Sequence, residues 1–329
     1  EASRAMNWQL MGYGRPTNPR LSQEKEVVLF RNMLTQSNTT HKSVPLFLSS
    51  VGTHQHEELF RRKGLPALFN EAGFDTWFIS NQSQQGAMID RLAHDARHLV
   101  YIRSPRHDMQ LLEEVQKAVR RSSSPRLFFI LHCYGSHFSY HERYPREFAR
   151  FLPDDNVSIA PQNARELCNA YDNSVCYTDH FLAETIAYLR SLSGVSSAVL
   201  YCADHGEDLL DDERQRFLHA SPTATAYQLW VASLAWFSPD YRAAFPGVAE
   251  TAAANSDVPA NTHALFHTMA QIAAISSPYV RDSVSLVSPA FDRRAPRYYL
   301  NDHNEAVPYL RAGLRPQDLE VFRKNGIEL

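Results

Sequence analysis

Short apolar runs separated by longer amphipathic stretches dominate the hydrophobic pattern of this chain. Three runs have the length and apolar content of buried strands, at 76–80, 126–132 and 197–203. Between them, apolar positions recur at helical spacing, which predicts helices over 65–72, 109–121 and 163–192. Gly73 follows the first of these helices, as is typical of a helix C-terminus.

Strands that alternate with helices predict an α/β fold with a mostly parallel sheet and helices on both faces. In such sheets ligands bind at the carboxyl ends of the strands. The Ala- and Pro-rich segment 241–261 is interpreted as a surface excursion. We expect one catalytic domain over 1–329, in which 285–329 forms a smaller appended unit with a strand near 297–300 and a helix near 316–324.

Charge and composition narrow the possible classes of protein. The 33 basic and 36 acidic residues among 329 leave a net charge of −3, which gives no reason to expect a nucleic-acid partner. No run approaches the roughly 20 apolar residues that span a bilayer. The chain opens on Glu1 and a polar stretch, so a membrane anchor upstream would not be visible in this sequence.

The four cysteines leave the cellular compartment open. Cys168 and Cys176 are separated by eight positions within one predicted helix, about 12 Å along its axis. Disulfide geometry forbids a bridge over that distance. Cys133 and Cys202 adjoin apolar runs and are interpreted as core thiols.

Side chains of the types that commonly bind metals follow two of the predicted strands. Asp204-His205-Gly206-Glu207 comes directly after the run at 197–203, and His132 and His137 follow the run at 126–132. His219 lies about a dozen residues beyond the first group. Carboxylates together with imidazoles suit zinc or manganese, and two such ions can clamp the attacking and leaving oxygens of a phosphoryl transfer.

These residues also have a structural interpretation. A solitary histidine at a strand end is more often a hydrogen-bonded structural residue, and the acidic run 208–213 is most simply a solvated loop. Charged groups directly after a buried strand are costly, however, unless they are paired or bound to metal. The Asp-His-Gly-Glu run therefore favours a metal site.

The set of motifs resembles the phosphoethanolamine transferases of the alkaline phosphatase/sulfatase superfamily. The resemblance is carried by the Asp-His-Gly-Glu run, by the His-x-x-Gly-x-His pattern of 132–137, by Glu1-Ala2-Ser3-Arg4 with Gly12-Tyr13-Gly14, and by Asn169 to Asn173. It extends in order from Glu1 to about Pro239 and implies an alkaline-phosphatase-like fold.

The resemblance also implies roles for single residues. Glu1, a threonine, Asp204 and His205 are expected to hold the first metal, and Glu207 and His219 to lie at the metals as well. His132 and His137 are expected near the phosphate, and Asn81 and Gln85 are expected to contact substrate. Lipid A-modifying members carry a lysine at the last of these positions, so Gln85 removes a positive charge.

The nucleophile is located only to a pair of threonines. Aligned without gaps on Ser43-Val44-Pro45, the family threonine falls on Asn38, which cannot accept a phosphoryl group. Thr39 and Thr40 follow, and we prefer Thr40, with Thr39 as the alternative. A hydroxyl becomes a competent nucleophile on a metal ion, whereas the structural interpretation makes both threonines helix N-caps.

These inferences combine into one hypothesis. One or two zinc ions, with manganese as an alternative, would support transfer of phosphoethanolamine from phosphatidylethanolamine to lipid A or another glycan. Thr40 would carry the phosphoryl group, and His137 and His219 would assist the acceptor. The resemblance implies a membrane-anchored protein at the periplasmic face of the bacterial inner membrane.

Three other functions are alternatives to this hypothesis. A phosphoglycerol transferase, phosphodiesterase or phosphatase would use the same centre on another group. Asn38 keeps open a catalytically inactive binding relative. A sulfatase is disfavoured because no Cys/Ser-x-Pro-x-Arg motif occurs near Thr40.

Overall fold

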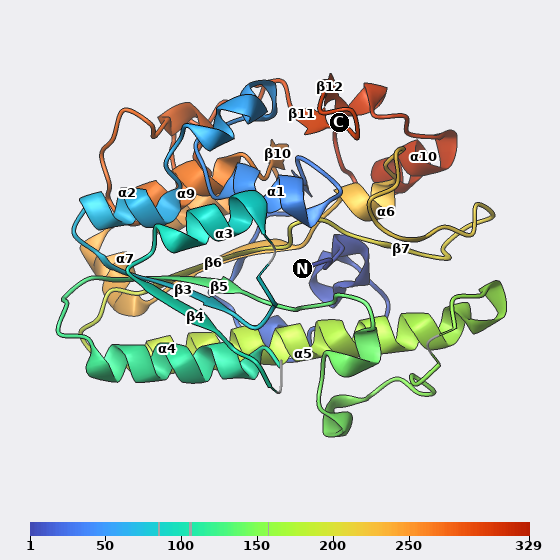
Figure 1. Ribbon diagram of the computed structural model, residues 1–329, viewed down its shortest axis with the longest axis horizontal. Coiled ribbons are helices and arrows are strands. Elements are labelled where there is room, and N and C mark those ends of the chain that lie inside the picture. Colours follow the sequence, from blue (N-terminus) through green and yellow to red (C-terminus); the bar gives the residue numbers. More distant parts are fainter. Residues whose placement is uncertain (85, 105–106, 157) are drawn as a thin grey trace.

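The computed structural model describes residues 1–84, 86–104, 107–156 and 158–329. Figure 1 shows the strands between two layers of helices. One layer contains α4 (Met109–Arg121) and α5 (Ala164–Ser191), and the other contains α1 (Thr40–Phe47), α2 (Leu65–Glu71), α3 (Ala87–His94) and α9 (Ala264–Ile272). The predicted α/β architecture with helices on both faces is confirmed.

The strands form two main groups. β3 (Asp75–Ser80) pairs in parallel with β4 (His98–Tyr101) and with β5 (Leu127–His132). β9 (Ser233–Phe237) pairs antiparallel with β6 (Ala198–Cys202) and β1 (Val28–Leu29). A cavity of about 170 Å³ lies between β5 and β6, and Glu1, His132 and Asp204 contribute to its lining. The ends of the two strand groups therefore meet at the residues that carry the candidate chemistry.

Shorter elements complete the chain. Three strand pairs are β2 (Met33–Leu34) with β10 (Ala260–Asn261), β7 (Asp208–Leu209) with β8 (Phe217–Leu218), and β11 (Tyr298–Leu300) with β12 (Ala306–Pro308). The remaining α-helices are α6 (Ala226–Leu229), α7 (Pro239–Ala244), α8 (Val248–Ala254) and α10 (Pro316–Lys324). Short 3-10 helices lie between them: η1 (Ala5–Asn7), η2 (Gln9–Met11), η3 (Leu21–Gln23), η4 (Thr53–Phe60), η5 (Tyr140–Glu142), η6 (Arg146–Phe148), η7 (Pro161–Asn163), η8 (Asp282–Val284) and η9 (Tyr309–Arg311).

Neighbouring residues of β3 show how the two helix layers are held. Phe78 packs into a buried cluster with Phe69 of α2 and Phe266 of α9. Ile79, which points to the opposite face because side chains alternate along a strand, packs with residues of α4 and α5 such as Leu112. An apolar run without polar alternation is therefore what a strand covered on both faces requires.

The expected elements are largely confirmed, with one correction. The three predicted strands correspond to β3, β5 and β6, and the three predicted helices to α2, α4 and α5. Segment 241–261 is not a surface excursion, because Tyr241, Ala252 and Val258 are buried in a core cluster with Phe237. Ala249 and Ala252 of α8 pack in this cluster.

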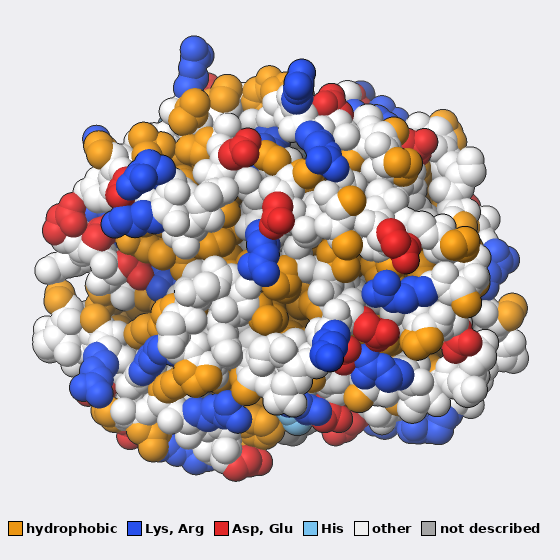
Figure 2. Space-filling model, turned by 180° about the vertical axis from the view of Figure 1, so that it is seen from behind, with side chains coloured by type: hydrophobic (Ala, Val, Ile, Leu, Met, Phe, Trp, Pro, Cys, Tyr) orange, Lys and Arg blue, Asp and Glu red, His pale blue; other side chains and the backbone are white. Residues whose placement is uncertain are grey.

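The C-terminal part is joined to the rest through a shared core. Tyr299, Tyr309 and Phe322 belong to the same buried cluster as Trp8 and Tyr171. Within the described residues, no helix has both the length and the apolar character needed to cross a bilayer. On the face in Figure 2, basic and acidic side chains are interspersed with apolar ones.

Candidate metal centre

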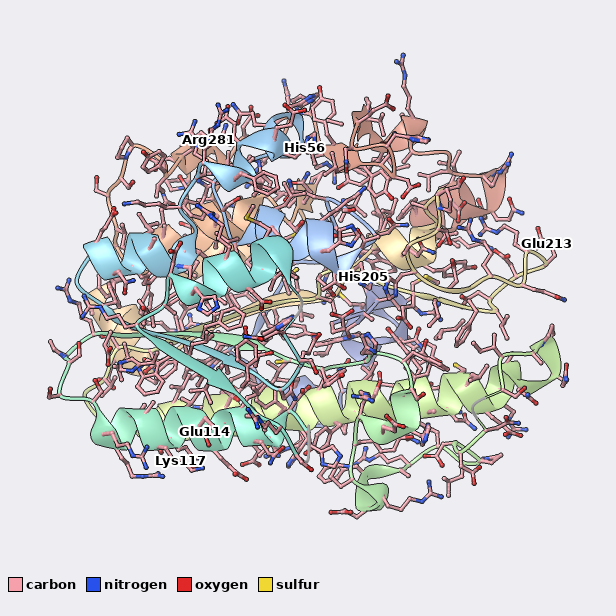
Figure 3. The ribbon with its side chains drawn as sticks, in the orientation of Figure 1. His56, Glu114, Lys117, His205, Glu213 and Arg281 are labelled. Carbon is pink, nitrogen blue, oxygen red and sulfur yellow. The ribbon has the colours of Figure 1, made fainter. Side chains whose placement is uncertain are left out.

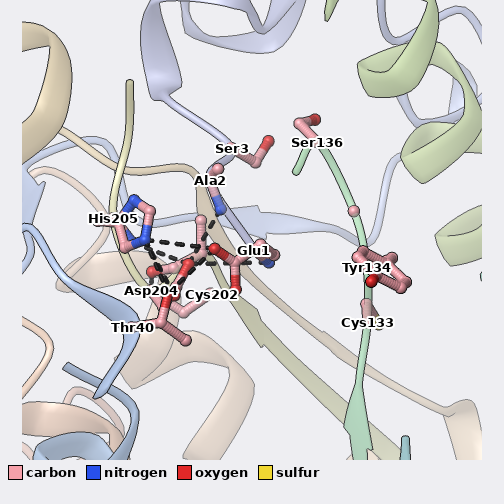
Figure 4. Close-up of polar contacts among 12 residues, drawn as sticks. Glu1, Ala2, Ser3, Thr40, Cys133, Tyr134, Ser136, Cys202, Asp204 and His205 are labelled. Carbon is pink, nitrogen blue, oxygen red and sulfur yellow. Dashed lines mark hydrogen bonds and ion pairs between the residues drawn. The ribbon is translucent and has the colours of Figure 1, made fainter. Parts of the chain in front are cut away.

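Four side chains from three separate parts of the chain converge at one point. Glu1 begins the chain, Thr40 is the first residue of α1, and Asp204 and His205 directly follow β6. Thr40 Oγ1 lies 3.0 Å from Glu1 Oε1 and 3.0 Å from His205 Nε2. His205 Nε2 lies 3.3 Å from Glu1 Oε1 and 3.4 Å from Asp204 Oδ2 (Figure 4). The structure thus brings together four residues that the sequence assigned to the first metal.

Backbone contacts hold these residues in place. Asp204 Oδ1 accepts hydrogen bonds from the amides of Ala2 and His205, each at 3.0 Å, which ties the start of the chain to the end of β6. Gly206 is required between the histidine and Glu207, because a Cβ there would lie 2.1 Å from the carbonyl oxygen of Tyr227. The Asp-His-Gly spacing is therefore imposed by packing as well as by chemistry.

The electrostatics of the centre favour a cation. Burial by itself would lower the pKa of His205, but the carboxylates of Asp204 and Glu1 raise it to about 9. Burial would likewise raise the pKa of Glu1, yet the hydrogen bond and charge of His205 hold it well below its usual value. Two carboxylates thus share one imidazole, which stabilises positive charge between them.

The same residues satisfy the requirements of a divalent metal. Asp204 Oδ2 is buried and, among the described residues, has no hydrogen-bond partner. His205 Nδ1 lies 2.9 Å from the carbonyl oxygen of Gly206, which leaves Nε2 for the centre. Ligand atoms of Glu1, His205 and His219 all lie within 4.8 Å of one another. Carboxylate and imidazole ligands of this kind suit zinc.

Glu207 was expected as a metal ligand, but its carboxylate lies behind His219. Glu207 Oε1 is 3.0 Å from His219 Nδ1, and the hydroxyl of Tyr140 donates to Glu207 Oε2. Glu207 is fully buried, and the rings of His219 and His205 have centroids 4.0 Å apart. Glu207 thus contacts the imidazole of His219 from within the core, and its role as a metal ligand stays a prediction.

The two histidines that follow β5 differ in their surroundings. His132 Nδ1 lies 3.1 Å from Ser80 Oγ, whereas its Nε2 is buried without a hydrogen-bond partner in the described chain. Burial lowers the pKa of His132. His137 is only partly buried and lies near enough for its charge to help lower the pKa of Glu1. His132 thus lies beside the centre within the sheet, and His137 lies at its more accessible side.

The expected substrate contacts receive less support. Asn81 is completely buried, and its side chain bonds Asp108 Oδ1 at 2.8 Å and the amide of Tyr134 at 2.8 Å. It holds the loop after β5 and does not face solvent. Gln85 lies outside the described residues.

Two residues near the centre were missed by sequence reasoning. Gln82 Nε2 donates to Glu1 Oε2 at 3.3 Å and to the carbonyl oxygen of Cys133 at 2.8 Å. Asp108, whose pKa is raised by burial, accepts from Asn81 and from the amides of Tyr134 and Gly135. The only signal for Gln82 was its position directly after a predicted strand, and no local pattern marked Asp108.

The structure separates the two candidate nucleophiles. Thr39 is the N-cap residue of α1 in extended conformation, and its hydroxyl is 3.5 Å from Ser37 Oγ. Thr40 Oγ1, one position later, reaches Glu1 and His205. Asn38 is buried, and its amide nitrogen donates to Gln228 Oε1 at 2.7 Å. Of the three side chains, the Thr40 hydroxyl is the one placed among the ligand atoms.

The C-terminal part fixes the loop that precedes Thr40. The Tyr299 hydroxyl donates to Asn38 Oδ1 at 2.7 Å, and the Tyr309 hydroxyl donates to the carbonyl oxygen of Thr35 at 2.8 Å. The amide of Leu300 donates to the Gln36 carbonyl at 2.7 Å. A segment more than 250 residues away in the sequence therefore holds the loop that leads to Thr40.

The acidic run 208–213 is not simply a solvated loop. Asp208 is buried and accepts from Thr225 Oγ1 at 2.7 Å and from Gln228 Nε2 at 2.6 Å, and burial raises its pKa to about 6. Asp211 forms a 2.8 Å ion pair with the buried guanidinium of Arg4. These carboxylates are held by partners distant in sequence, which a local charge pattern cannot reveal.

Comparison with known proteins places this site in a family. Residues 1–275 match the sulfatase family, and the chain belongs to that family. It is 31% identical, over 73% of its length, to the Kdo(2)-lipid A phosphoethanolamine 7''-transferase of Escherichia coli strain K12. The chain covers 44% of that protein, so it spans less than half of the relative's length. This relative is a phosphoethanolamine transferase, the group that the sequence motifs resemble.

Solved structures show the same fold. The soluble domain of lipooligosaccharide phosphoethanolamine transferase A from Neisseria meningitidis is 26% identical, with a TM-score of 0.79 over 87% of this chain and 89% of that one. The C-terminal periplasmic domain of EptC from Escherichia coli, solved in complex with Zn, is 23% identical, with a TM-score of 0.84 over 97% and 92%. At that identity the second likeness shows the fold alone, and the alkaline-phosphatase-like class is confirmed.

Proposed function

We propose that this chain is the catalytic domain of a zinc-dependent phosphoethanolamine transferase with Thr40 as its nucleophile. The observation that carries the proposal is the position of Thr40 Oγ1, 3.0 Å from both Glu1 and His205. Thr40 is the first residue of α1, and the N-terminus of a helix favours the negative charge of a phosphoryl group. The relatedness to a lipid A phosphoethanolamine transferase supports the substrate class.

Glu1, Asp204 and His205 would hold the zinc ion, and His219 would complete the ligand set or face the substrate. When bound, zinc lowers the pKa of a hydroxyl and stabilises the charge that develops on phosphoryl oxygens. A structural neighbour of the same fold was solved in complex with Zn, and the carboxylate and imidazole ligands suit zinc, with manganese as the alternative.

The proposed transfer has two balanced steps. Thr40 Oγ1 attacks the phosphorus of phosphatidylethanolamine and loses its proton, the bond from phosphorus to the glycerol oxygen breaks, and diacylglycerol leaves with a proton on that oxygen. The acceptor oxygen then attacks the phosphorus of the phosphoethanolamine ester on Thr40 and loses its proton, and the Thr40 oxygen leaves and regains one. Partly exposed His137 and His219 are placed to carry these protons.

The acceptor we propose is lipid A or another phosphorylated glycan at the periplasmic face of the inner membrane. The lipid A transferase relative and the periplasmic domain among the structural neighbours support this assignment. We further propose that residues 285–329 belong to the same domain as the centre, since Tyr299 and Tyr309 bond the nucleophile loop.

A headgroup-transfer assay tests the function. Zinc-loaded protein should release fluorescent diacylglycerol from labelled phosphatidylethanolamine in detergent micelles, and a chelator should abolish the release. Phosphatidylglycerol and nitrophenyl phosphate serve as competing donors, and Asp204→Asn serves as the variant without a complete metal site. Faster turnover of either competing donor than of phosphatidylethanolamine would assign the chain to the rival phosphoglycerol transferases or phosphatases.

A further inference from the structure

A second cavity lies away from the metal centre and has the opposite electrostatic character. It has a volume of about 400 Å³, within the range of small-molecule sites. Its walls come from the start of η4, from the junction of β10 and α9, and from the segment between Arg281 and Tyr298. Figure 3 shows Arg281 well separated from His205. Nothing in the proposed transfer uses this cavity.

Two arginines contribute to the lining without a carboxylate partner. The Arg281 guanidinium lies 3.0 Å from His263 Nε2. The Arg297 guanidinium donates to main-chain carbonyl oxygens, at 2.7 Å to Glu328 and at 3.4 Å to Ala260. In the part of the chain that the structure describes, no carboxylate oxygen lies within 4.0 Å of either guanidinium. Their positive charges are therefore available to a ligand.

Two arginines and one aspartate, Asp292, leave the lining with a net positive charge. Burial, together with the charge of Arg281, lowers the pKa of His263 to about 4, so this imidazole is neutral at pH 7. Asp292 is exposed, and its Oδ1 accepts the amide of Arg294 at 3.0 Å. Ala264, the first residue of α9, also lines the cavity and brings the positive end of a helix dipole to it.

The remaining walls suit a ligand that is larger than an ion and carries hydroxyl groups. Tyr298 packs edge-on against His54, with ring centroids 4.0 Å apart, and forms an aromatic wall. Gln36 and Asn261 add side-chain amides that can donate and accept hydrogen bonds. A guanidinium pair recognises phosphate oxygens with directed hydrogen bonds, while the amides and the aromatic surface match a sugar ring.

We infer that this cavity binds a phosphorylated sugar, with Arg281 and Arg297 as the phosphate-binding residues. This inference goes beyond the proposed transfer and does not rest on it, because none of the residues that carry it is a metal ligand or a nucleophile candidate. Gln36 places the cavity against the loop that leads to Thr40.

Calorimetric titration with glucose 6-phosphate tests the inference, with glucose and inorganic phosphate as separate probes. Glucose 6-phosphate should bind more tightly than either, and binding should survive a chelator and Thr40→Ala. Arg281→Gln and Arg297→Gln should each weaken binding at least about tenfold, since each removes charge-assisted hydrogen bonds. Arg294→Gln, in the same segment but outside the lining, is the matched control and should bind as the unaltered protein does.

Any of the following results would overturn the inference. Loss of binding on chelation would place the ligand at the metal centre, and equal affinity for inorganic phosphate would remove the sugar. Unchanged affinity in Arg281→Gln decides against the site even if Arg297→Gln fails to fold, because Arg281 is exposed and its replacement leaves the core intact. Activity in the headgroup-transfer assay is independent of these results, so failure here is distinguishable from failure of the proposed function.

Discussion

The candidate metal centre and the arginine-lined cavity each contain a histidine, and the charges that face the two histidines are opposite in sign. In the centre, the carboxylates of Asp204 and Glu1 outweigh burial and raise the pKa of His205 to about 9. In the cavity, burial and the neighbouring Arg281 lower the pKa of His263 to about 4. Burial acts in the same direction on both imidazoles, so the sign of the net shift is set by the charges that face them. We therefore propose a cation for the first region and an anion for the second.

The largest expected effect lies at the nucleophile. Thr40→Ala should lower headgroup transfer by at least about 10³-fold, because it removes the attacking oxygen and leaves the metal ligands in place. Thr39→Ala is the control and should remain within about tenfold, since its hydroxyl faces Ser37. Mass spectrometry of trapped phosphoenzyme reads out the intermediate. A phosphorylated Thr40→Ala protein would show that another residue carries the phosphoryl group.

A smaller effect is expected at Glu207, whose carboxylate contacts His219. Glu207→Gln should lower kcat by about 10–100-fold, because the orientation of His219 is weakened. Zinc content, measured by atomic emission, should stay close to that of the unaltered protein, whereas Asp204→Asn should lose it. Glu213→Gln, on an exposed residue of the same segment, is the matched control. Equal zinc loss in Glu207→Gln and Asp204→Asn would instead make Glu207 a ligand.

The cavity predicts a pH effect on stability. The folded-state pKa of His263, about 4, lies below the unfolded value of about 6.5. The unfolded chain therefore takes up the extra proton first as the pH falls, and stability declines between about pH 6.5 and pH 4 by up to about 1.4 kcal/mol per pH unit. Urea unfolding across this range should show a shallower decline in His263→Gln. His303→Gln, on an exposed histidine, should leave the decline unchanged.

The smallest effect concerns the contact that joins the C-terminal part to the nucleophile loop. Tyr299→Phe removes the hydroxyl that donates to Asn38 and should lower the free energy of unfolding by about 1 kcal/mol. Because the loop leads to Thr40, kcat should fall with little change in KM. Tyr298→Phe, at the neighbouring position with its ring packed on His54, is the control for kcat. An unchanged kcat in Tyr299→Phe would mean that the loop is held well enough by its other contacts.

Local patterns of apolar and polar residues predict much of the fold. β3, β5 and β6 were predicted because strands covered on both faces need continuous apolar runs, and α5 was predicted from its long helical periodicity. The pattern failed at 241–261, where one face of α8, with Ala249 and Ala252, packs into a core cluster that composition alone does not indicate. The local charge pattern also failed for Asp208 and Asp211. Asp208 is held by Gln228, and Asp211 is held by Arg4, and neither partner adjoins the acidic run in the sequence.

The sequence by itself determined the kind of chemistry at the candidate site. An aspartate, a histidine and a glycine after an apolar strand specify ligand types and a tight turn, and these are local properties of the chain. They placed Asp204 and His205 correctly at the end of β6. His219 was marked by its position a dozen residues later, and Glu1 was added through the resemblance; the structure brings both to the same point.

Only the tertiary structure decided between neighbouring candidates. It placed the Thr40 hydroxyl, and not that of Thr39, within reach of Glu1 and His205, and it turned Glu207 behind His219. The physical reason is that the backbone changes from extended at Thr39 to helical at Thr40, which points the two side chains differently. The partners that Thr40 meets are 39 and 165 positions away. The arginine-lined cavity was likewise invisible in the sequence, since its walls come from segments that only folding brings together.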